Sequence, residues 1–440
     1  MSPRRLLPVL LAGAALATAA PAAQALPAGA VVPVAGKQTC AGGRGAPCAT
    51  ITRGLVNPVS GVFSSDGRSL YVGSLGNGGI YPFARDTRSG KLNPIQQCLG
   101  HQVGCDGASH PMPWKLALTH DDRFLYAGGA NAEAGLLAYT RDPATGALTP
   151  AGCLHGYRDA CSLPGGNDGE SDVTGIEVTP DDRFMLVSST HGIGVVDRDP
   201  ATGALSQRPG NCIVNDYEGT SYDEPSKGCA EQEKIGRPMG IDLAPDGRFA
   251  YVAAEDGGLQ ILTLDAAGTL ARAGKAAGPS GFDDVVVTPD GRNVYAITED
   301  FDLLAYTRDA TTGALARIKG KTGCFGIPPC AWIKGINTPE DLRVSPDGKY
   351  VYAEGSDGIA VLKRDARGAL RQAHDRSACT SMNGTDYLGI DKRRNCVKGA
   401  FRLKNLTGLE VAPGGRHLYA LETEIYLGYG TGVVQPVTRR

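Results

Sequence analysis

One short phrase recurs seven times along this 440-residue chain. Each copy has a turn such as Thr-Pro-Asp-Gly-Arg, then a strand such as Phe-Leu-Tyr-Val, and in most copies Arg-Asp-x-x-Thr-Gly-Ala-Leu. A repeat of this kind indicates one supersecondary unit copied along the chain. It therefore predicts one large domain, where length alone would suggest about three. The turn positions are Asp66, Asp121, Asp181, Asp246, Asp290 and Asp347, with Gly414 in the seventh copy.

Each repeat carries four strand signals. In the fifth copy, residues 284–288, 293–298, 303–308 and 313–318 are apolar or β-branched, and Asp, Gly, Pro and Asn between them favour tight hairpins. Four antiparallel strands repeated seven times predict an all-β, seven-bladed β-propeller.

The chain ends predict how the ring closes. The seventh copy stops one strand short, whereas residues 28–31 and 37–40 resemble residues 313–315 and 321–324 of a fourth strand. We therefore expect residues 26–40 to supply the outer strand of the last blade, which would leave no open sheet edge. Residues 26–440 would then be a single domain.

The N-terminus has the pattern of a secretory signal peptide over residues 1–25. Arg4 and Arg5 precede an apolar stretch, and Ala23-Gln24-Ala25 offers a cleavage site before Leu26. We expect a secreted, extracellular monomer without a membrane anchor. The net charge of −2 gives no general basic footprint for nucleic acid.

The twelve cysteines fall into six neighbouring couples, and in an exported chain we expect them to form disulfides. Zinc binding is the rival interpretation, but the spacings are wide and variable. Each couple joins the end of an outer strand to the connection that enters the next blade, so disulfides and length variation concentrate on one face. We take this looped face as the candidate binding surface. The couples are Cys40 with Cys48, Cys98 with Cys105, Cys153 with Cys161, Cys212 with Cys229, Cys324 with Cys330 and Cys379 with Cys396.

The phrases Ser-Pro-Asp-Gly-Lys-Tyr-Val-Tyr at 345–352, Ala-Pro-Asp-Gly-Arg-Phe-Ala-Tyr-Val at 244–252 and Thr-Pro-Asp-Gly-Arg at 288–292 resemble the YVTN/lactonase-like β-propeller family. That family includes 6-phosphogluconolactonases and carboxymuconate-cyclising enzymes. The resemblance covers essentially all of the mature chain and implies a lactonase-like propeller. The third copy departs from it, because Leu186 replaces the tyrosine. The cysteines and the export signal depart from the cytosolic enzymes and argue against phosphogluconolactone as the substrate.

Charged residues recur at one position of the predicted inner strands. The position four residues before each turn aspartate holds, in chain order, Val62, Ala117, Glu177, Asp242, Val286, Arg343 and Glu410. Adjacent Arg343 and Glu410 could form an ion pair. Adjacent Glu177 and Asp242 would either share a proton, with one pKa raised, or hold a cation such as calcium.

These four charges give a catalytic hypothesis and a structural one. In the first, Glu177, Asp242, Arg343 and Glu410 form an acid/base or metal-assisted site for a lactone or small acid, in which a carboxylate activates water and Arg343 stabilises an oxyanion. In the second, they form inter-blade salt bridges or face channel water, and we give this interpretation about twice the weight.

Further candidates lie at the channel mouth and on the looped face. The residues of this predicted rim are Trp114, Lys115, Arg237, Asp284 and Asp341, and Tyr217 and Tyr222 belong to a long acidic disulfide loop. Two function classes remain open. One is a lactonase-like hydrolase or isomerase, and the other is a non-catalytic propeller that binds a cell-wall, carbohydrate or protein ligand on the looped face.

Overall fold

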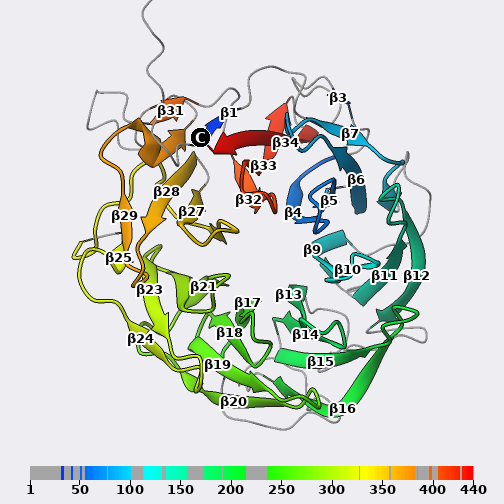
Figure 1. Ribbon diagram of the computed structural model, residues 1–440, viewed down its shortest axis with the longest axis horizontal. Helices are drawn as coiled ribbons and strands as arrows, with labels where there is room; N and C mark the ends of the chain where they lie inside the picture. The colour runs from blue at the N-terminus through cyan, green and yellow to red at the C-terminus, as the bar shows by residue number, and fades with distance from the viewer. Residues whose placement is uncertain are drawn as a thin grey trace, which may run out of the picture.

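In the computed structural model the chain is an all-β propeller, with sheets arranged around a common centre (Figure 1). The structure describes residues 31–33, 41–42, 50–51, 55–76, 78–100, 112–130, 135–155, 173–190, 192–214, 235–326, 328–355, 358–381, 384, 396–398, 405–426 and 429–439. Within these ranges the one helical element is the 3₁₀ turn Arg376–Ala378, and no helix is long and apolar enough to cross a membrane. The predicted signal peptide, residues 1–25, lies outside them.

The described strands form seven sheets (Figure 1). In six of them the first strand along the chain lies nearest the centre, whereas in the seventh the strands from the N-terminal part of the chain lie at the outer edge. We name each sheet by its strands. The β4–β8 sheet has β4 (Pro58–Phe63), β5 (Ser69–Ser74), β6 (Gly79–Arg85), β7 (Leu92–Pro94) and β8 (Leu99–Gly100). The β9–β12 sheet has β9 (Met112–Leu118), β10 (Phe124–Ala130), β11 (Gly135–Arg141) and β12 (Leu148–His155). The β13–β16 sheet has β13 (Val173–Val178), β14 (Phe184–Ser189), β15 (Gly192–Arg198) and β16 (Leu205–Val214).

The remaining sheets follow the same order. The β17–β20 sheet has β17 (Pro238–Leu243), β18 (Phe249–Ala254), β19 (Gly258–Leu264) and β20 (Leu270–Lys275). The β21–β25 sheet has β21 (Phe282–Val287), β22 (Asn293–Thr298), β23 (Leu303–Arg308), β24 (Leu315–Arg317) and β25 (Cys324–Phe325). The β26–β31 sheet has β26 (Asp341–Val344), β27 (Tyr350–Gly355), β28 (Gly358–Arg364), β29 (Leu370–Gln372), β30 (Cys379–Ser381) and β31 (Val397–Lys398). The β32–β34 sheet has β32 (Leu406–Val411), β33 (His417–Tyr426) and β34 (Tyr429–Arg439), with β1 (Val31–Pro33), β2 (Ala41–Gly42) and β3 (Thr50–Ile51) at its outer edge.

The fourth, outer strand of each sheet is irregular. In three sheets it is continuous but contains a register shift, for example between Ile261 and Leu262 on β19 opposite β20. In the other four, two short strands share the outer edge, as β24 and β25 do against β23. The four strands expected from the sequence are therefore present, but their pairing is irregular at the outer edge of every sheet, and the innermost pair of strands also has a register shift in six sheets. A bulge or break bends a strand and increases its twist.

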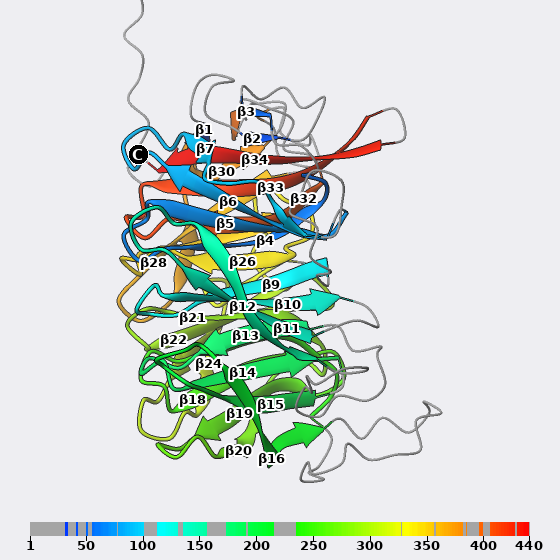
Figure 2. The same ribbon diagram turned by 90° about the vertical axis from the view of Figure 1, so that its right-hand side faces the viewer.

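The hydrophobic core lies between consecutive sheets. One cluster, for instance, joins Phe249 and Tyr251 of β18 to Val285 of β21 and Val294 of β22. Figure 2 shows the sheets stacked side by side along the molecule. Burial of apolar surface between neighbouring sheets explains why a single repeat cannot be stable alone.

The repeated Pro-Asp-Gly turn is stabilised by its aspartate. In the fifth copy, Asp290 Oδ1 accepts hydrogen bonds from Thr288 Oγ1 at 2.6 Å and from the Arg292 N–H at 3.2 Å. Gly291 has φ +67°, a left-handed conformation that glycine adopts at little cost. The turn thus favours the residue types that recur in the repeats, although Asp122 and Asp182 adopt the left-handed conformation in place of glycine in two copies.

A tyrosine and an arginine connect each pair of consecutive sheets at almost every junction; we call this the Tyr–Arg contact. Tyr251 Oη donates to the Gly313 carbonyl at 2.9 Å and accepts from Arg308 Nε at 2.7 Å. Arg308 Nη1 donates to the Gly291 carbonyl at 3.0 Å, and Nη2 pairs with Asp246 at 2.5 Å. The arginine of the Arg-Asp-x-x-Thr-Gly phrase therefore binds the turn of its own sheet and the turn aspartate of the preceding one.

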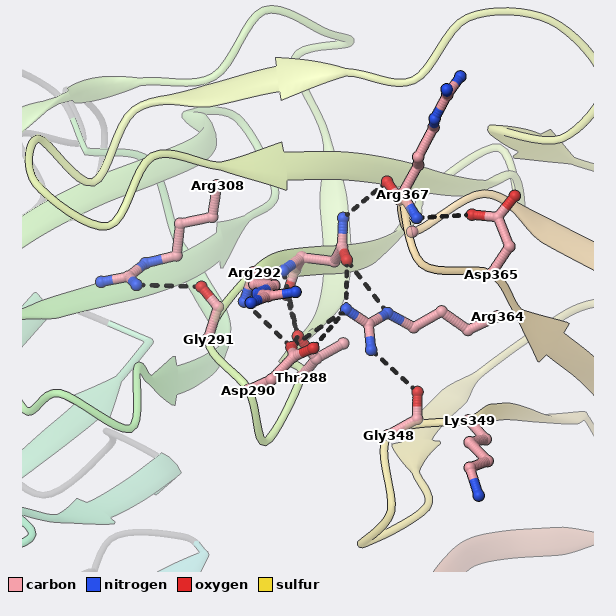
Figure 3. A network of polar contacts seen from close by, with 12 residues as sticks. Thr288, Asp290, Gly291, Arg292, Arg308, Gly348, Lys349, Arg364, Asp365 and Arg367 are labelled. Carbon is pink, nitrogen blue, oxygen red and sulfur yellow. Dashed lines mark hydrogen bonds and ion pairs between the residues drawn. The ribbon is translucent and has the colours of Figure 1, made fainter.

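Figure 3 shows the next junction, where Arg364 takes the same position. Its Nη1 donates to the Gly348 carbonyl at 3.0 Å, and its Nη2 lies 2.8 Å from Asp290 Oδ2. Six arginines contact the preceding sheet. Arg85, Arg141, Arg198 and Arg308 donate to its tyrosine hydroxyl, and Arg364 and Arg439 pair with its turn aspartate.

The junction between the β13–β16 and β17–β20 sheets is the exception. Leu186 replaces the tyrosine on β14, and Leu264 replaces the arginine on β19. Both side chains are buried and belong to one hydrophobic cluster. The departure of the third repeat from the tyrosine pattern is therefore matched by a second departure in the fourth repeat.

Two of the predicted disulfides lie wholly within the described residues. Cys324–Cys330 and Cys379–Cys396 are bonded, with Cα atoms 4.9 and 4.8 Å apart. Three further couples are described at one end, because Cys98, Cys153 and Cys212 are also disulfide-bonded. Their predicted partners Cys105, Cys161 and Cys229 lie outside the described residues.

The first predicted couple is not tested by the structure. Cys40 lies outside the described residues, and Cys48 lies outside them as well. A disulfide between Cys40 and Cys48 therefore stays a prediction from the sequence.

Candidate functional site

The charged inner-strand residues occupy equivalent places in their sheets. Glu177 on β13 pairs in register with Leu186, Asp242 on β17 with Tyr251, Arg343 on β26 with Tyr352 and Glu410 on β32 with Tyr419. Each therefore lies opposite the tyrosine position of the next strand, or the leucine that replaces it. The structure brings these four residues to one level of the propeller.

Two residues predicted for the rim join them. Asp284 and Asp341 lie two positions before Val286 and Arg343, and side chains two apart on a strand point to the same side. Lys115 of β9 also acts electrostatically on Glu177 and Asp284. We call this set the inner-strand cluster; it comprises Lys115, Glu177, Asp242, Asp284, Asp341, Arg343 and Glu410.

Members of the cluster on distant strands act on one another electrostatically. Burial is the main cause of the raised pKa of Glu177, and the charge of Arg343 opposes this increase. Glu177 lies on β13 and Arg343 on β26, which are both innermost strands of their sheets (Figure 1). Glu177, Asp242, Asp284 and Arg343 are each only partly buried.

Four carboxylates of the cluster bind the backbone of the following inner strand. Asp242 accepts from the Val287 N–H at 2.7 Å and Asp284 from the Leu342 N–H at 2.9 Å. Asp341 accepts from the Leu409 N–H at 3.2 Å, and Glu410 from the Gly61 N–H at 3.1 Å. A Cβ at Gly61 would lie 2.8 Å from Glu410 Cγ, so this close approach requires glycine. These four carboxylates therefore connect consecutive inner strands through backbone hydrogen bonds, a contact that was not predicted from the sequence.

Arg343 is the cationic centre of the cluster. It forms ion pairs with Asp341 and with Glu410, the latter at 3.2 Å, as the sequence predicted for adjacent blades. Burial lowers the pKa of Arg343, but Asp341, Glu410 and Asp284 outweigh that effect and keep the pKa well above its ordinary value. The guanidinium is therefore permanently charged.

Glu177 differs from the other carboxylates. Among the described residues it accepts no hydrogen bond from the next inner strand. Burial, and then the charge of Asp242, raise the pKa of Glu177 well above its ordinary value. Burial also raises the pKa of Asp242 to about 7, against the hydrogen bond from Val287 and the charge of Arg343. A Glu177 with a raised pKa, interacting with an Asp242 whose pKa is about 7, is an arrangement suited to proton transfer.

Asp284 has a similar environment. Burial and the neighbouring Asp341 raise the pKa of Asp284 to about 7, whereas Arg343, Lys115 and the Leu342 N–H oppose the increase. Two aspartates of the cluster thus change charge in the same range of pH.

Sequence reasoning missed Glu354. This residue lies on β27 opposite Asp341, is almost fully buried, and its Oε1 has no hydrogen-bond partner among the described residues. Burial and then Asp341 raise the pKa of Glu354 well above its ordinary value. The signal available in the sequence was a glutamate inside the otherwise apolar run Tyr-Val-Tyr-Ala-Glu at 350–354.

The other rim candidates are dispersed. Trp114 of β9 is 37% exposed, and Arg237 forms an exposed ion pair with Glu255 at 3.1 Å. Neither contacts the inner-strand cluster in the part of the chain that the structure describes. Tyr217 and Tyr222 lie outside that part. Within it, the group that could hold a metal by proximity is Asp302 with Cys324 and Cys330, but the two cysteines form a disulfide and are not free to ligate.

No family model matches this chain, and no curated protein matches it by sequence. Solved structures do match in fold. A protein described provisionally as a 6-phosphogluconolactonase from Bacteroides fragilis is 19% identical with a TM-score of 0.52, covering 71% of this chain and 82% of its own. The periplasmic gluconolactonase PpgL of Pseudomonas aeruginosa is 18% identical with a TM-score of 0.53, covering 72% and 84%.

The β-propeller of a protein that is not described as a lactonase matches equally well. The β-propeller domain of Cps50 (Swd1) from Myceliophteria thermophila is 13% identical with a TM-score of 0.54, covering 86% of this chain and 96% of its own. Identities this low show a shared fold, and fold alone does not assign function. This chain is therefore similar in architecture to 6-phosphogluconolactonase-like β-propellers.

Proposed function

We propose that the inner-strand cluster hydrolyses a small lactone. The observation that carries this proposal is the pair of Glu177, whose pKa is raised well above its ordinary value, and Asp242, whose pKa is raised to about 7. Permanently charged Arg343 acts on both carboxyls. The fold shared with proteins described as gluconolactonases supports a lactone as the substrate class.

In this mechanism each residue has one role. Ionised Asp242 removes a proton from a water molecule, whose oxygen attacks the lactone carbonyl carbon. Arg343 stabilises the negative charge that develops on the carbonyl oxygen. When the ring C–O bond breaks, protonated Glu177 donates its proton to the departing alkoxide. The product is an open hydroxy acid, and the proton on Asp242 returns through water to Glu177.

The test is a panel of five- and six-membered lactones with the mature protein. Asp242→Asn and Glu177→Gln keep size and remove the titrating group, so we expect kcat/KM to fall by roughly 10²-fold or more with the fold retained. Asp309→Asn is the matched control, because Asp309 lies in an exposed turn and caps only Thr311 and Thr312. Activity that both cluster variants retain in full, or a panel with no turnover by the unaltered protein, would exclude the proposal.

The same carboxylates are also a candidate cation site. Burial and the like charge of Asp341 raise the pKa of Asp284, and a bound calcium ion would relieve that repulsion. Elemental analysis of purified protein for calcium tests this. One possible result is one calcium ion per chain, which is lost in Asp242→Asn and in Asp284→Asn. That result would mean that a bound metal ion, and not a general base, activates the water molecule.

A second candidate function, ligand binding on the looped face, has its own observation. The exposed large hydrophobic side chains of the described residues are Trp114 (37%), Phe301 (41%) and Trp332 (47%). Phe301 lies in the β22–β23 hairpin, and Trp332 precedes β26, so both are on the face opposite the Pro-Asp-Gly turns. Exposed aromatic rings favour a carbohydrate or protein ligand. The test is binding of the unaltered protein and of Trp332→Ala to a glycan array or to a protein partner. Binding that is lost in Trp332→Ala, while lactone hydrolysis is unchanged or absent, would favour this function.

We also propose that the seven sheets are seven blades of a closed ring in a secreted protein. Val31–Pro33 pairs antiparallel with Val437–Arg439, which supports residues 26–40 as the closing segment. Inner strand β32 contacts β4, and Glu410 binds the Gly61 N–H across that junction. The disulfides are compatible with an oxidising compartment.

A further inference from the structure

The leucine junction between the β13–β16 and β17–β20 sheets contains a pocket. Its volume is about 530 Å³, and it lies on the face of the Pro-Asp-Gly turns. The lining includes Asp181 and Phe184 from one sheet and Gly247, Phe249 and Leu264 from the next. Leu264 stands where the repeat otherwise has the arginine of the Tyr–Arg contact, so the pocket coincides with the missing side chain.

The glycines of the turns show that a guanidinium is missing here. A Cβ atom added to Gly67, Gly291 or Gly348 would lie 3.3, 3.4 or 3.2 Å, respectively, from Nη1 of the arginine in the same sheet. A Cβ atom added to Gly247 would contact only Pro180. Among the described residues no donor binds the Gly247 carbonyl, whereas the carbonyls of the other three glycines each accept from that Nη1.

The turn aspartate of the preceding sheet is also less covered. The side chain of Asp181 is 53% exposed, compared with 31% for Asp246, 39% for Asp290 and 34% for Asp347, which each pair with the arginine of the next sheet. Asp181 has only its neighbour Arg183, at 3.8 Å, as an ion-pair partner within the described residues. Two acceptors that hold a guanidinium at other junctions, the turn aspartate and the glycine carbonyl, are therefore present here without it, whereas the tyrosine hydroxyl is missing because Leu186 replaces it.

An aromatic face completes the set. Arg198 and Arg308 lie 4.8 and 5.2 Å from the ring centres of Phe124 and Phe249, the residues equivalent to Phe184. Arg183 and Arg208 flank the Phe184 ring at 4.9 and 5.5 Å. Arg208 is held by Asp197 at 2.6 Å and by the Ala267 carbonyl at 2.5 Å, so it does not bind Asp181 or Gly247.

From this geometry we infer that the pocket binds a guanidinium group supplied by another molecule, as an arginine side chain would supply it. The planar group would donate to the Asp181 carboxylate and the Gly247 carbonyl, reproducing contacts made by the chain's own arginines elsewhere. A lysine ammonium matches this set less well, because it lacks the paired donors of the guanidinium fork. This inference is independent of the lactonase proposal.

The direct test is titration of the mature protein with Nα-acetyl-arginine amide, followed by calorimetry or NMR. The citrulline analogue has nearly the same shape as the arginine probe but no charge. The lysine analogue has the positive charge but lacks the paired N–H donors of a guanidinium. We expect the arginine probe to bind at least tenfold more tightly than either. Equal binding of arginine and citrulline probes, or no saturable binding of the arginine probe, would overturn the inference. A five-residue peptide centred on arginine then separates the two sources: tighter binding than the single residue indicates a peptide ligand, and equal binding a small molecule.

Variants locate the site. Asp181→Asn is expected to weaken arginine binding at least tenfold, whereas Asp121→Asn, at a junction already occupied by Arg198, is expected to leave it unchanged. Leu264→Arg would supply the guanidinium internally and abolish binding, and Leu264→Met keeps the volume and is expected to preserve it. Unchanged binding in a folded Asp181→Asn protein would overturn the assignment even if Leu264→Arg fails to fold.

Discussion

Some buried tyrosine hydroxyls in this protein form hydrogen bonds, and others have no hydrogen-bond partner among the described residues. Tyr251 Oη both donates and accepts a hydrogen bond between two sheets, whereas the equally buried Tyr306 Oη has no partner among the described residues. A buried polar group contributes to stability only when it is paired.

We therefore predict opposite results for two chemically identical changes. Tyr251→Phe leaves the Gly313 carbonyl and Arg308 Nε without their partner and is expected to lower the free energy of unfolding by about 1–3 kcal/mol. Tyr306→Phe removes only an unpaired hydroxyl and is expected to be neutral or slightly stabilising. Urea denaturation of both variants measures the difference, and equal losses would contradict the pairing that the structure shows.

The raised carboxyl pKa values also predict how stability depends on pH. A carboxyl whose pKa is higher in the folded than in the unfolded state binds more protons when folded, so its contribution is present at low pH and is lost as pH rises through the folded value. For Asp242 and Asp284 that loss falls between about pH 4 and pH 7. Asp347 has the opposite sign: burial alone would raise its pKa, but hydrogen bonds with Arg439 and Ser345 outweigh burial and lower the pKa to about 2.

The Asp242 contribution can be isolated. Asp242→Asn is expected to be more stable relative to the unaltered protein at pH 8 than at pH 4, by at most about 4 kcal/mol for a shift from 3.8 to about 7. Thermal unfolding at the two pH values measures this difference. A relative stability that does not change with pH would show that Asp242 titrates normally.

At the scale of the element, residues that face each other across a junction between two sheets are substituted together. Leu186 and Leu264 replace the tyrosine and arginine together, because either replacement alone would bury an unpaired polar group. The two positions should therefore be energetically coupled.

A double-mutant cycle tests this coupling. Leu186→Tyr and Leu264→Arg are each expected to destabilise the protein, whereas the double variant is expected to lose at least about 1 kcal/mol less than the sum of the two. Additive effects would mean that the two positions do not form a contact equivalent to Tyr251 and Arg308.

The elements show clearly which features the sequence can predict. The first three strands and the Pro-Asp-Gly turns follow from alternation and from Asp and Gly at fixed places, so their positions were predictable within the fifth repeat almost to the residue. The fourth strand was not, because its bulges and breaks depend on the longer path at the edge of the sheet. For the candidate site, the equivalence of Glu177, Asp242, Arg343 and Glu410 could be read from spacing. Asp284 was predicted only as a rim residue and Glu354 was not predicted, because their relation to the other charges depends on how strands pair in space, as Glu354 does with Asp341.

At the scale of the whole molecule, the pairing of β1 with β34 joins residues more than 400 positions apart in the sequence. If residues 26–40 close the ring, removing them exposes the edge of β34 and breaks the link between the first and last parts of the chain.

We predict that a protein starting at residue 41 unfolds at least several degrees below one starting at Leu26, and associates at lower concentration because the part of β34 that pairs with β1 loses its partner. Differential scanning calorimetry and light scattering measure the two effects. The protein starting at Leu26 is the matched control, since it lacks only the predicted signal peptide. Identical melting of the two proteins would show that the N-terminal segment does not close the ring.

The leucine pair at one junction has a consequence for how such a chain can change over evolutionary time. Repeats that share the Tyr–Arg contact carry matching side chains there, so an exchange between them would preserve this contact. An exchange of the third or the fourth repeat would not, because Leu186 in one is matched by Leu264 in the next. We therefore expect these two repeats to be inherited together.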